Sequence, residues 1–235
     1  MTKQPFISTS IRRLAISLLL LMMTSVTQAQ VKFFTMEKDS IPLFCGFSVS
    51  FDLGGAGLLA FSDYGQYEGA LRFNLRDRYF PTIELGLGDA KHEVDAVTGI
   101  EAKVRAPYGR IGCDFNVSKN KHDIYRVMVG ARYALTSFKT EAYGNVSVPA
   151  WGGTVDYSVE TDKCFYHWAE FLFSVDAQIW GPVRLGWSVR YRAKLGSSDM
   201  GNNSLWYVPG YGKDGYKLGG TFNVTVELGR KNKKI

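Results

Sequence analysis

The sequence predicts an all-β protein, an eight-stranded antiparallel up-and-down transmembrane β-barrel. Apolar residues alternate with small, polar or charged residues in eight segments, and this period of two is typical of strands with two different faces. Long and short connections alternate between the segments. No stretch after residue 30 is apolar for long enough to cross a bilayer as a helix. The 235 residues suffice for one domain with a sizeable core.

The N-terminus has the pattern of a secretion signal. Three basic residues precede the apolar run Leu14–Met23, and Thr27–Ala29 offers small residues where signal peptidase cleaves. We therefore expect a signal peptide at residues 1–29, with a retained N-terminal anchor as the alternative. Residues 30–42 would then form a periplasmic leader.

The predicted barrel covers residues 43–228, and a basic tail follows at residues 229–235. In its first strand the odd positions from Leu43 to Leu53 are apolar or cysteine, while from residue 46 the even positions carry Gly, Ser or Asp. The predicted strands are residues 43–53, 67–75, 80–88, 107–117, 123–138, 165–179, 183–195 and 217–228.

The connections between these strands fall into two length classes. The short ones are residues 76–79, 118–122 and 180–182, and the long ones are residues 54–66, 89–106, 139–164 and 196–216. Outer-membrane barrels have short periplasmic turns and long outer loops, so the alternation favours this class. An even number of strands then places both termini in the periplasm.

Two observations indicate that the apolar face points outward. Its many aromatic residues would overfill the lumen of an eight-stranded barrel, which is only wide enough for side chains or one small ligand. Aromatic residues also gather near the strand ends, as in the girdles of membrane barrels. They are Phe44, Tyr79, Phe80, Tyr125 and Trp180 towards the short turns, and Tyr67, Phe138, Tyr166 and Trp168 towards the long loops. A secreted barrel of the lipocalin kind, with apolar residues inside, is the alternative.

The opposite face mixes small residues with charges of both signs, and arginine predominates among its cations. Arginine pairs bidentately with carboxylates, which suits a narrow lumen with little water. The predicted lumenal charge network consists of Asp52, Glu68, Arg72, Glu84, Arg110, Asp114, Arg126, Arg132, Glu170, Asp176, Arg184, Arg190, Arg192, Lys194 and Glu227. We expect this network to plug the lumen.

The stretch VRLGWSVRYRAKL, residues 183–195, carries four cations and no acid. Its odd positions would face lipid and its even positions the lumen. Arg192 and Lys194 lie near the predicted outer mouth, where the cations can exceed the acids that neutralise them. These two residues are therefore the predicted outer-mouth anion site.

Other chemistry is not indicated. Without the signal peptide and the tail the body of the chain is near neutral, which argues against nucleic-acid binding. The glycines of Gly54–Gly57 and Gly86–Gly88 are interpreted as turn and strand glycines. Cys45 and Cys113 fall on apolar faces and are interpreted as packing residues. No residue is assigned a catalytic, cofactor-binding or metal-binding role, and no cofactor is expected.

Several segments carry a family resemblance: FCGFSVSFDL, DYGQYEGALRFNL, YFPTIELGLG, APYGRIGCDFNVSKNKHDIYR and WYVPGYGKDG. They resemble an uncharacterised outer-membrane β-barrel family of Bacteroidota, a domain of unknown function. The architecture is also similar to barrels of the OmpA and OmpX type, although those usually end in an aromatic residue and this last strand ends near Leu228. The resemblance implies the fold and an outer-membrane location, and it implies no established activity.

The expected role is structural or interactive, through the long outer loops of a plugged barrel. Partners would be outer-membrane lipid and an envelope protein or extracellular ligand, and the loop aromatics Trp151, Trp206, Tyr207 and Tyr211 could form a binding rim. A narrow small-solute channel is the alternative. A lipid-modifying enzyme with His167 and Glu170 comes third, because nothing in the sequence marks a nucleophile.

Overall fold

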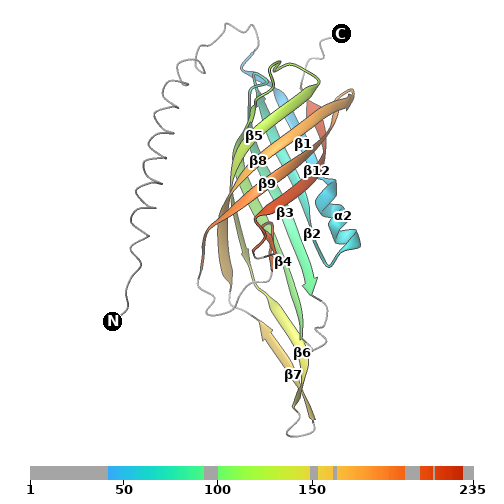
Figure 1. Cartoon of the computed structure of the whole chain (residues 1–235), viewed down its shortest axis with the longest axis vertical. Coiled ribbons are helices and arrows are strands. Elements are labelled where there is room, and N and C mark those ends of the chain that lie inside the picture. Colours follow the sequence, from blue (N-terminus) through green and yellow to red (C-terminus); the bar gives the residue numbers. More distant parts are fainter. Residues whose placement is uncertain are drawn as a thin grey trace, which may run out of the picture. The chain divides into compact units, whose positions relative to one another are not determined.

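The computed structural model describes residues 42–92, 100–148, 153–160, 163–198, 207–213 and 215–229 (Figure 1). Eight long strands form a closed antiparallel barrel, so the predicted fold class is confirmed. They are β1 (Phe44–Asp52), β2 (Tyr64–Leu75), β3 (Tyr79–His92), β4 (Ile100–Asn116), β5 (Tyr125–Phe138), β8 (Cys164–Trp180), β9 (Val183–Ser197) and β12 (Leu218–Leu228). Each strand pairs with its neighbours in the chain, and β1 closes the barrel against β12.

The short connections lie together at one end, which we call the short-turn end. In the β2–β3 turn, Arg76 and Asp77 have φ of 56° and 55°, and the N–H of Arg78 donates to the carbonyl of Leu75. This left-handed pair is the geometry of a type I′ turn, whose twist suits a two-residue hairpin. Gly229 approaches Gly46 at the same end, so the described chain enters and leaves the barrel there.

The long connections contain structure that the sequence analysis did not predict. The connection after β1 forms the helix α2 (Leu53–Phe61), and the segment before β8 forms the hairpin β6 (Glu141–Val148) and β7 (Gly153–Glu160). The β9–β12 connection contains the small hairpin β10 (Tyr207–Val208) and β11 (Gly212–Lys213). The predicted loop 89–106 is largely strand, because β3 and β4 pair from Tyr79 to His92. Gly54–Gly57 thus lies in a helix and not in a turn.

Helix α2 follows β1 directly and packs against the two strands that flank β1. β1 stops at Asp52, whose side chain accepts hydrogen bonds from the N–H groups of Gly54 at 3.0 Å and of Phe222 in β12 at 3.2 Å. The helix then lies on the outside of the barrel against β2 and β12 (Figure 1). A Cβ on Gly65 would lie 2.5 Å from the backbone nitrogen of Leu59, so the close contact between helix and β2 requires glycine there.

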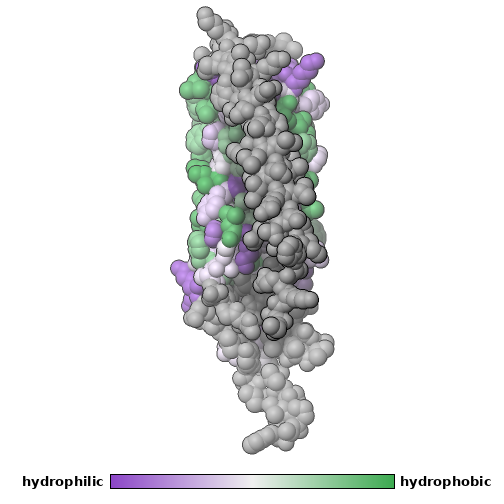
Figure 2. Space-filling model, turned by 60° about the vertical axis from the view of Figure 1, so that its left-hand side comes forward, coloured by the Kyte–Doolittle hydropathy of each residue, from purple (hydrophilic) through white to green (hydrophobic). Residues whose placement is uncertain are grey.

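Hydrophobic residues cover the outer surface of the barrel wall. In Figure 2 hydrophobic residues line the visible flanks, with hydrophilic residues at the upper right and lower left. Exposed large side chains include Leu85, Ile111, Phe171, Trp187 and Phe222, from five different strands. Among the described residues, none of the helices has the length and apolar composition needed to cross a membrane.

Both faces of the wall change polarity towards the long-loop end. In β4, Arg110 and Asp114 are buried inside while Ile111 and Phe115 are exposed outside. The long-loop end, which is drawn at the bottom of Figure 1, is called the upper end. Above Tyr108 in this sense the order reverses: Val104 and Ala106 are buried and Arg105 is exposed. The interior of this upper part is the hydrophobic core of the protein, formed by Ala90, Val104, Ala106, Tyr108, Ala134, Phe138, Cys164, Tyr166, Trp168, Tyr207, Val208 and Tyr211.

Candidate functional site

The middle of the lumen is filled by carboxylates and arginines from several strands. Glu84 on β3 accepts from Arg132 Nε at 3.1 Å and from Arg190 Nη1 at 2.8 Å. Arg110 on β4 contacts both Glu84 and Glu68. All of these side chains are at most 5% exposed. Inward-pointing positions of distant strands meet here because alternate residues face the barrel axis.

Two aromatic side chains complete this layer. The Tyr108 hydroxyl donates to Glu68 Oε2 at 2.6 Å, and the Trp168 indole donates to Glu170 Oε1 at 2.7 Å. Glu170 also lies 3.2 Å from Arg110 Nε and 3.5 Å from Arg190 Nη1. A buried carboxylate is tolerable only when it is paired and hydrogen-bonded, and these contacts meet that need.

A second layer lies nearer the short-turn end. Asp114 pairs with Arg132 at 2.7 Å and with Arg72 at 3.4 Å. Arg72 reaches on to Asp176 at 3.6 Å, and Arg184 Nε donates to Asp176 at 2.7 Å. The shared arginines join the two layers into one network.

The third layer seals the short-turn end, and the sequence analysis missed its central residue. Asp77, in the β2–β3 turn, is 3.3 Å from Arg126 and 2.8 Å from His122 Nδ1. Arg126 also pairs with Glu227 on β12 at 2.5 Å. Asp77 was overlooked because it belongs to a turn, where alternation gives no information on direction. Its left-handed conformation, which Asp tolerates, turns the carboxylate back into the lumen.

The structure places all but one of the predicted lumenal charges inside the barrel. Asp52 is buried as the cap of α2 described above, and the others join the ion pairs of the three layers. Lys194 is the correction: its side chain is exposed at the long-loop end, with Nζ 5.0 Å from the centre of the Tyr166 ring. Lys194 pairs with the inward-pointing Trp168, so the alternation holds as far as this residue, but Lys194 lies at the open end of the lumen, where its side chain is exposed and belongs to none of the ion pairs described above.

The predicted anion site does not form as a pair. Arg192 is buried, pairs with Glu170 at 3.5 Å and donates to the carbonyl of Tyr211. Its guanidinium therefore holds protein groups, while Lys194 lies outside the network. Although both cations lie on β9, Arg192 binds protein groups in the lumen and Lys194 lies over the Tyr166 ring.

The hairpin β10–β11 closes the lumen above the charge network. Tyr207, Val208 and Tyr211 are at most 3% exposed. The carbonyl of Gly210, at the tip, accepts from Arg110 Nη2 at 2.7 Å, and the Tyr207 hydroxyl donates to the carbonyl of Gly65. We call residues 207–213 the plug hairpin. Arg110 and Arg192 thus join the network to the plug hairpin.

Several predictions about aromatic residues were wrong. Phe80, Phe138, Tyr166 and Trp168 are buried inside the barrel and are not interfacial anchors. Trp168 contacts the Tyr211 ring edge-on, with ring centres 5.7 Å apart. Phe44, Tyr125, Trp180 and Tyr67 are exposed on the wall, as a girdle requires. Tyr207 and Tyr211 belong to the plug and not to a rim, and Trp151 and Trp206 lie outside the described residues.

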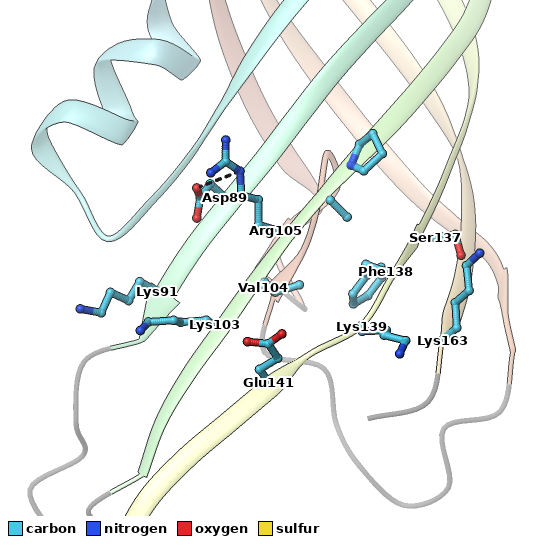
Figure 3. Close-up of a pocket in the computed structure, with 12 residues that line it drawn as sticks. Asp89, Lys91, Lys103, Val104, Arg105, Ser137, Phe138, Lys139, Glu141 and Lys163 are labelled. Carbon is cyan, nitrogen blue, oxygen red and sulfur yellow. Dashed lines mark ion pairs between the residues drawn. The ribbon is translucent and has the colours of Figure 1, made fainter. Parts of the chain in front are cut away.

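An open pocket of about 710 Å³ lies outside the core at the long-loop end (Figure 3). Val104 on β4 and Phe138 on β5 form its apolar floor, and Glu141 on β6 points towards them. Lysines lie around its edge, and Arg105 pairs with Asp89 at 3.6 Å. Nearby, the hydrogen bond and charge of Lys103, with the charge of Lys91, hold the pKa of Glu101 below its usual value.

His167 and Glu170 lie on opposite faces of β8. His167 Nδ1 is 3.3 Å from the Tyr133 hydroxyl on the outer face, whereas Glu170 is fully buried in the lumen. The structure therefore does not bring the two residues into one site. None of the three cysteines, all of them among the described residues, forms a disulfide, and Cys164 is buried in the core.

Comparisons with known proteins give a family and a weak structural likeness. No curated protein matches the chain. The crystal structure of CarO from Acinetobacter baumannii is similar at 14% sequence identity with a TM-score of 0.36, over 80% of this chain and 97% of that one. The family model described as "Domain of unknown function (DUF6048)" matches residues 11–228. The chain therefore belongs to the DUF6048 family.

Proposed function

We propose that the protein is an outer-membrane β-barrel that does not conduct solutes and that acts in the envelope through its long-loop end. The observation that carries this proposal is the reversal of polarity along the wall. The lower wall is apolar outside and charged inside, which suits a bilayer as surroundings. The upper wall is charged outside and apolar inside, which suits water. The change from Leu85 to Asp89 on β3 would mark the outer edge of the bilayer.

The closed state is supported by what fills the lumen. Three layers of ion pairs run from Asp77 to Glu170, and the plug hairpin covers the uppermost layer. A path for ions would require both the plug hairpin to leave and buried pairs to separate. Because breaking one buried pair costs about 3–5 kcal/mol, we favour a plug over the narrow channel that is the alternative.

A role in interaction is supported by the position of the β6–β7 hairpin. β6 continues the sheet from β4, pairing from Lys103 to Ile100, and β7 pairs with β6 beyond the closed barrel (Figure 1). Such a projecting hairpin is suited to binding an envelope protein or an extracellular ligand. No catalytic step is part of this proposal.

The location is tested by fractionation. We expect the protein in the outer-membrane fraction, with a shift in gel migration on heating, because folded membrane barrels resist detergent unfolding. Full recovery from the soluble fraction would contradict the proposal and favour the secreted barrel.

Closure is tested by conductance in planar bilayers. We expect no discrete openings from the wild-type protein. A variant in which Gly and Ser replace residues 207–213 distinguishes the contribution of the plug hairpin from that of the ion pairs. It shows no conductance if the ion pairs alone close the lumen. Discrete, salt-dependent openings of the wild type would overturn the closed state.

The interaction is tested by pull-down from envelope extracts with the full barrel and with a variant that joins β5 to β8 by a short turn. We expect an envelope protein that only the full barrel retains. Identical retention by both forms would argue against a role of the β6–β7 hairpin.

A further inference from the structure

The barrel wall has a gap between β4 and β5 at the long-loop end. Their ladder ends at Tyr108 and Thr136, and β4 next pairs with β6 at Lys103 and Glu141. Residues 104–107 and 137–140 therefore face one another without forming a ladder, and we call this gap the notch. Its lower edge is set by Pro107, which has no N–H to donate, and the Thr136 hydroxyl donates to the Pro107 carbonyl at 2.9 Å.

The notch opens into the pocket of about 710 Å³ and has an apolar floor. Val104 and Phe138, which form the floor, belong to the hydrophobic core and are 2% and 3% exposed. Pro107 and Ser137 line its lower edge. A ligand in the notch would thus meet an apolar surface behind it.

The rim of the notch is positively charged. Five cations and two carboxylates line the pocket: Lys91, Lys103, Arg105, Lys139 and Lys163, with Asp89 and Glu141. Glu101 compensates part of this charge, since it lies 3.4 Å from Lys91 and 3.0 Å from Lys103. The pairs of the rim are exposed, so a stronger anion can replace their carboxylates at little cost.

The notch also lies at the level where the wall changes polarity. Below it the wall exposes Leu85, Ile111 and Leu135, and at its own level the wall exposes Lys103 and Arg105. In a bilayer this is the depth at which acyl chains give way to head groups. Basic pockets at that depth bind anionic lipid head groups, and lysine and arginine are the usual partners of phosphate.

We propose that the notch binds the phosphorylated head group of an outer-leaflet glycolipid. The cations of the rim hold the phosphate, while Val104, Phe138 and Pro107 contact the sugar and the start of the acyl chains. This assignment rests on the proposed outer-membrane location and adds to it a ligand class and a site.

The test measures lipid binding by the purified full-length mature protein in a non-ionic detergent. The probes are bisphosphorylated lipid A, the same lipid without its phosphates, and inorganic pyrophosphate. We expect lipid A to bind at least about tenfold more tightly than either other probe, since only lipid A offers both the charge and the apolar body. Equal binding of dephosphorylated lipid A would overturn the role of the cations. Equal binding of pyrophosphate would overturn the lipid as the source of the phosphate.

A pair of variants separates the notch from charge in general. The notch variant carries Arg105→Gln, Lys139→Gln and Lys163→Gln. The matched control carries Lys194→Gln, Lys213→Gln and Lys217→Gln, three cations towards the same end that do not line the pocket. At about 1 kcal/mol for each cation near an anionic lipid, the notch variant should lose on the order of 100-fold in affinity and the control little. Equal losses would overturn the site.

Heat-modifiable migration of each variant checks that it is folded. If lipid A fails to bind although the wild-type protein is recovered from the outer membrane, the proposed lipid site is contradicted and the proposed location is not. If the protein is recovered from the soluble fraction, both the proposed location and the proposed lipid site are contradicted.

Discussion

Below Tyr108 the barrel holds its charges inside and its apolar residues outside, whereas above Tyr108 the same strands do the reverse. The lower half has a lumen of paired ions, and the upper half has a core of packed aromatic residues beneath the plug hairpin. The lower half resembles a membrane protein and the upper half a soluble one. Period-two alternation therefore specifies a strand, while the face on which its apolar residues lie specifies whether lipid or water surrounds it.

The two halves also differ in how they respond to damage. A buried ion that loses its partner stays charged in a medium of low polarity, so the cost of one substitution in the lower half is large. A core that loses a side chain or a turn can partly collapse or open, so the cost in the upper half is smaller and local.

The largest effect is expected from Glu84→Gln, which removes the carboxylate shared by Arg132 and Arg190. We expect the free energy of unfolding to fall by about 3 kcal/mol, measured by urea titration in lipid vesicles with tryptophan fluorescence. Asp89→Asn, in an exposed pair, is the control and should cost less than about 1 kcal/mol. Similar losses in the two variants would show that the lumen is not the dry ion-pair network described above.

Gly210→Ala tests the upper half. Gly210 has a φ of 80°, and a Cβ there would lie 2.5 Å from the Tyr108 ring. We expect the plug hairpin to leave its seat at a cost of about 1–3 kcal/mol, with the barrel intact. Limited proteolysis should then cut within residues 207–217 in this variant and not in Glu84→Gln. If the hairpin stays protected from the protease, the added Cβ fits beside Tyr108, and the packing between Gly210 and Tyr108 is looser than described above.

Thr136→Val tests the lower edge of the notch, at the boundary between the halves. The substitution keeps the shape and removes the hydrogen bond to the Pro107 carbonyl. We expect a loss of about 1 kcal/mol and faster amide exchange at residues 137–138, measured by hydrogen–deuterium exchange. Unchanged exchange there would indicate that the strands diverge for another reason.

The smallest effect is expected from Lys194→Gln, which removes only the exposed cation above Tyr166. The loss of stability should be at most about 1 kcal/mol, whereas Arg192→Gln should cost more because Glu170 and the Tyr211 carbonyl lose their donor. Chemical denaturation of both variants under one set of conditions makes the comparison. A larger loss of stability in Lys194→Gln than in Arg192→Gln would indicate that Lys194 belongs to the lumenal charge network.

The sequence was most informative in the lower half. There the alternation, the balance of charges and the tight turns agree, so the strands and nearly all inward-pointing charges could be predicted. In residues 100–106 the alternation continues in the opposite phase, with Ala102, Val104 and Ala106 between charged residues. Their charges favour a loop when the segment is considered alone, whereas in the structure these charges belong to the outer face of β4.

Other elements lack a local signal altogether. Helix α2 contains three glycines in nine residues, a composition that disfavours helices, and it is held by the Asp52 cap and by its packing on β2. The inward turn of Tyr207 and Tyr211 depends on Arg110 and Arg192, which lie far away in the sequence. Such long-range partners cannot be read from one stretch of chain.

The meeting of the first and last strands has a consequence for how the barrel is assembled. β1 and β12 pair only from Phe47 to Asp52, while β3 and β4 pair over the whole of β3. Every other pair of neighbouring strands can form as a local hairpin or soon after its connection is made, but this pair must wait for the whole chain. We therefore expect the β1–β12 seam to form last, with the bond from Phe222 to Asp52 acting as the latch that fastens it.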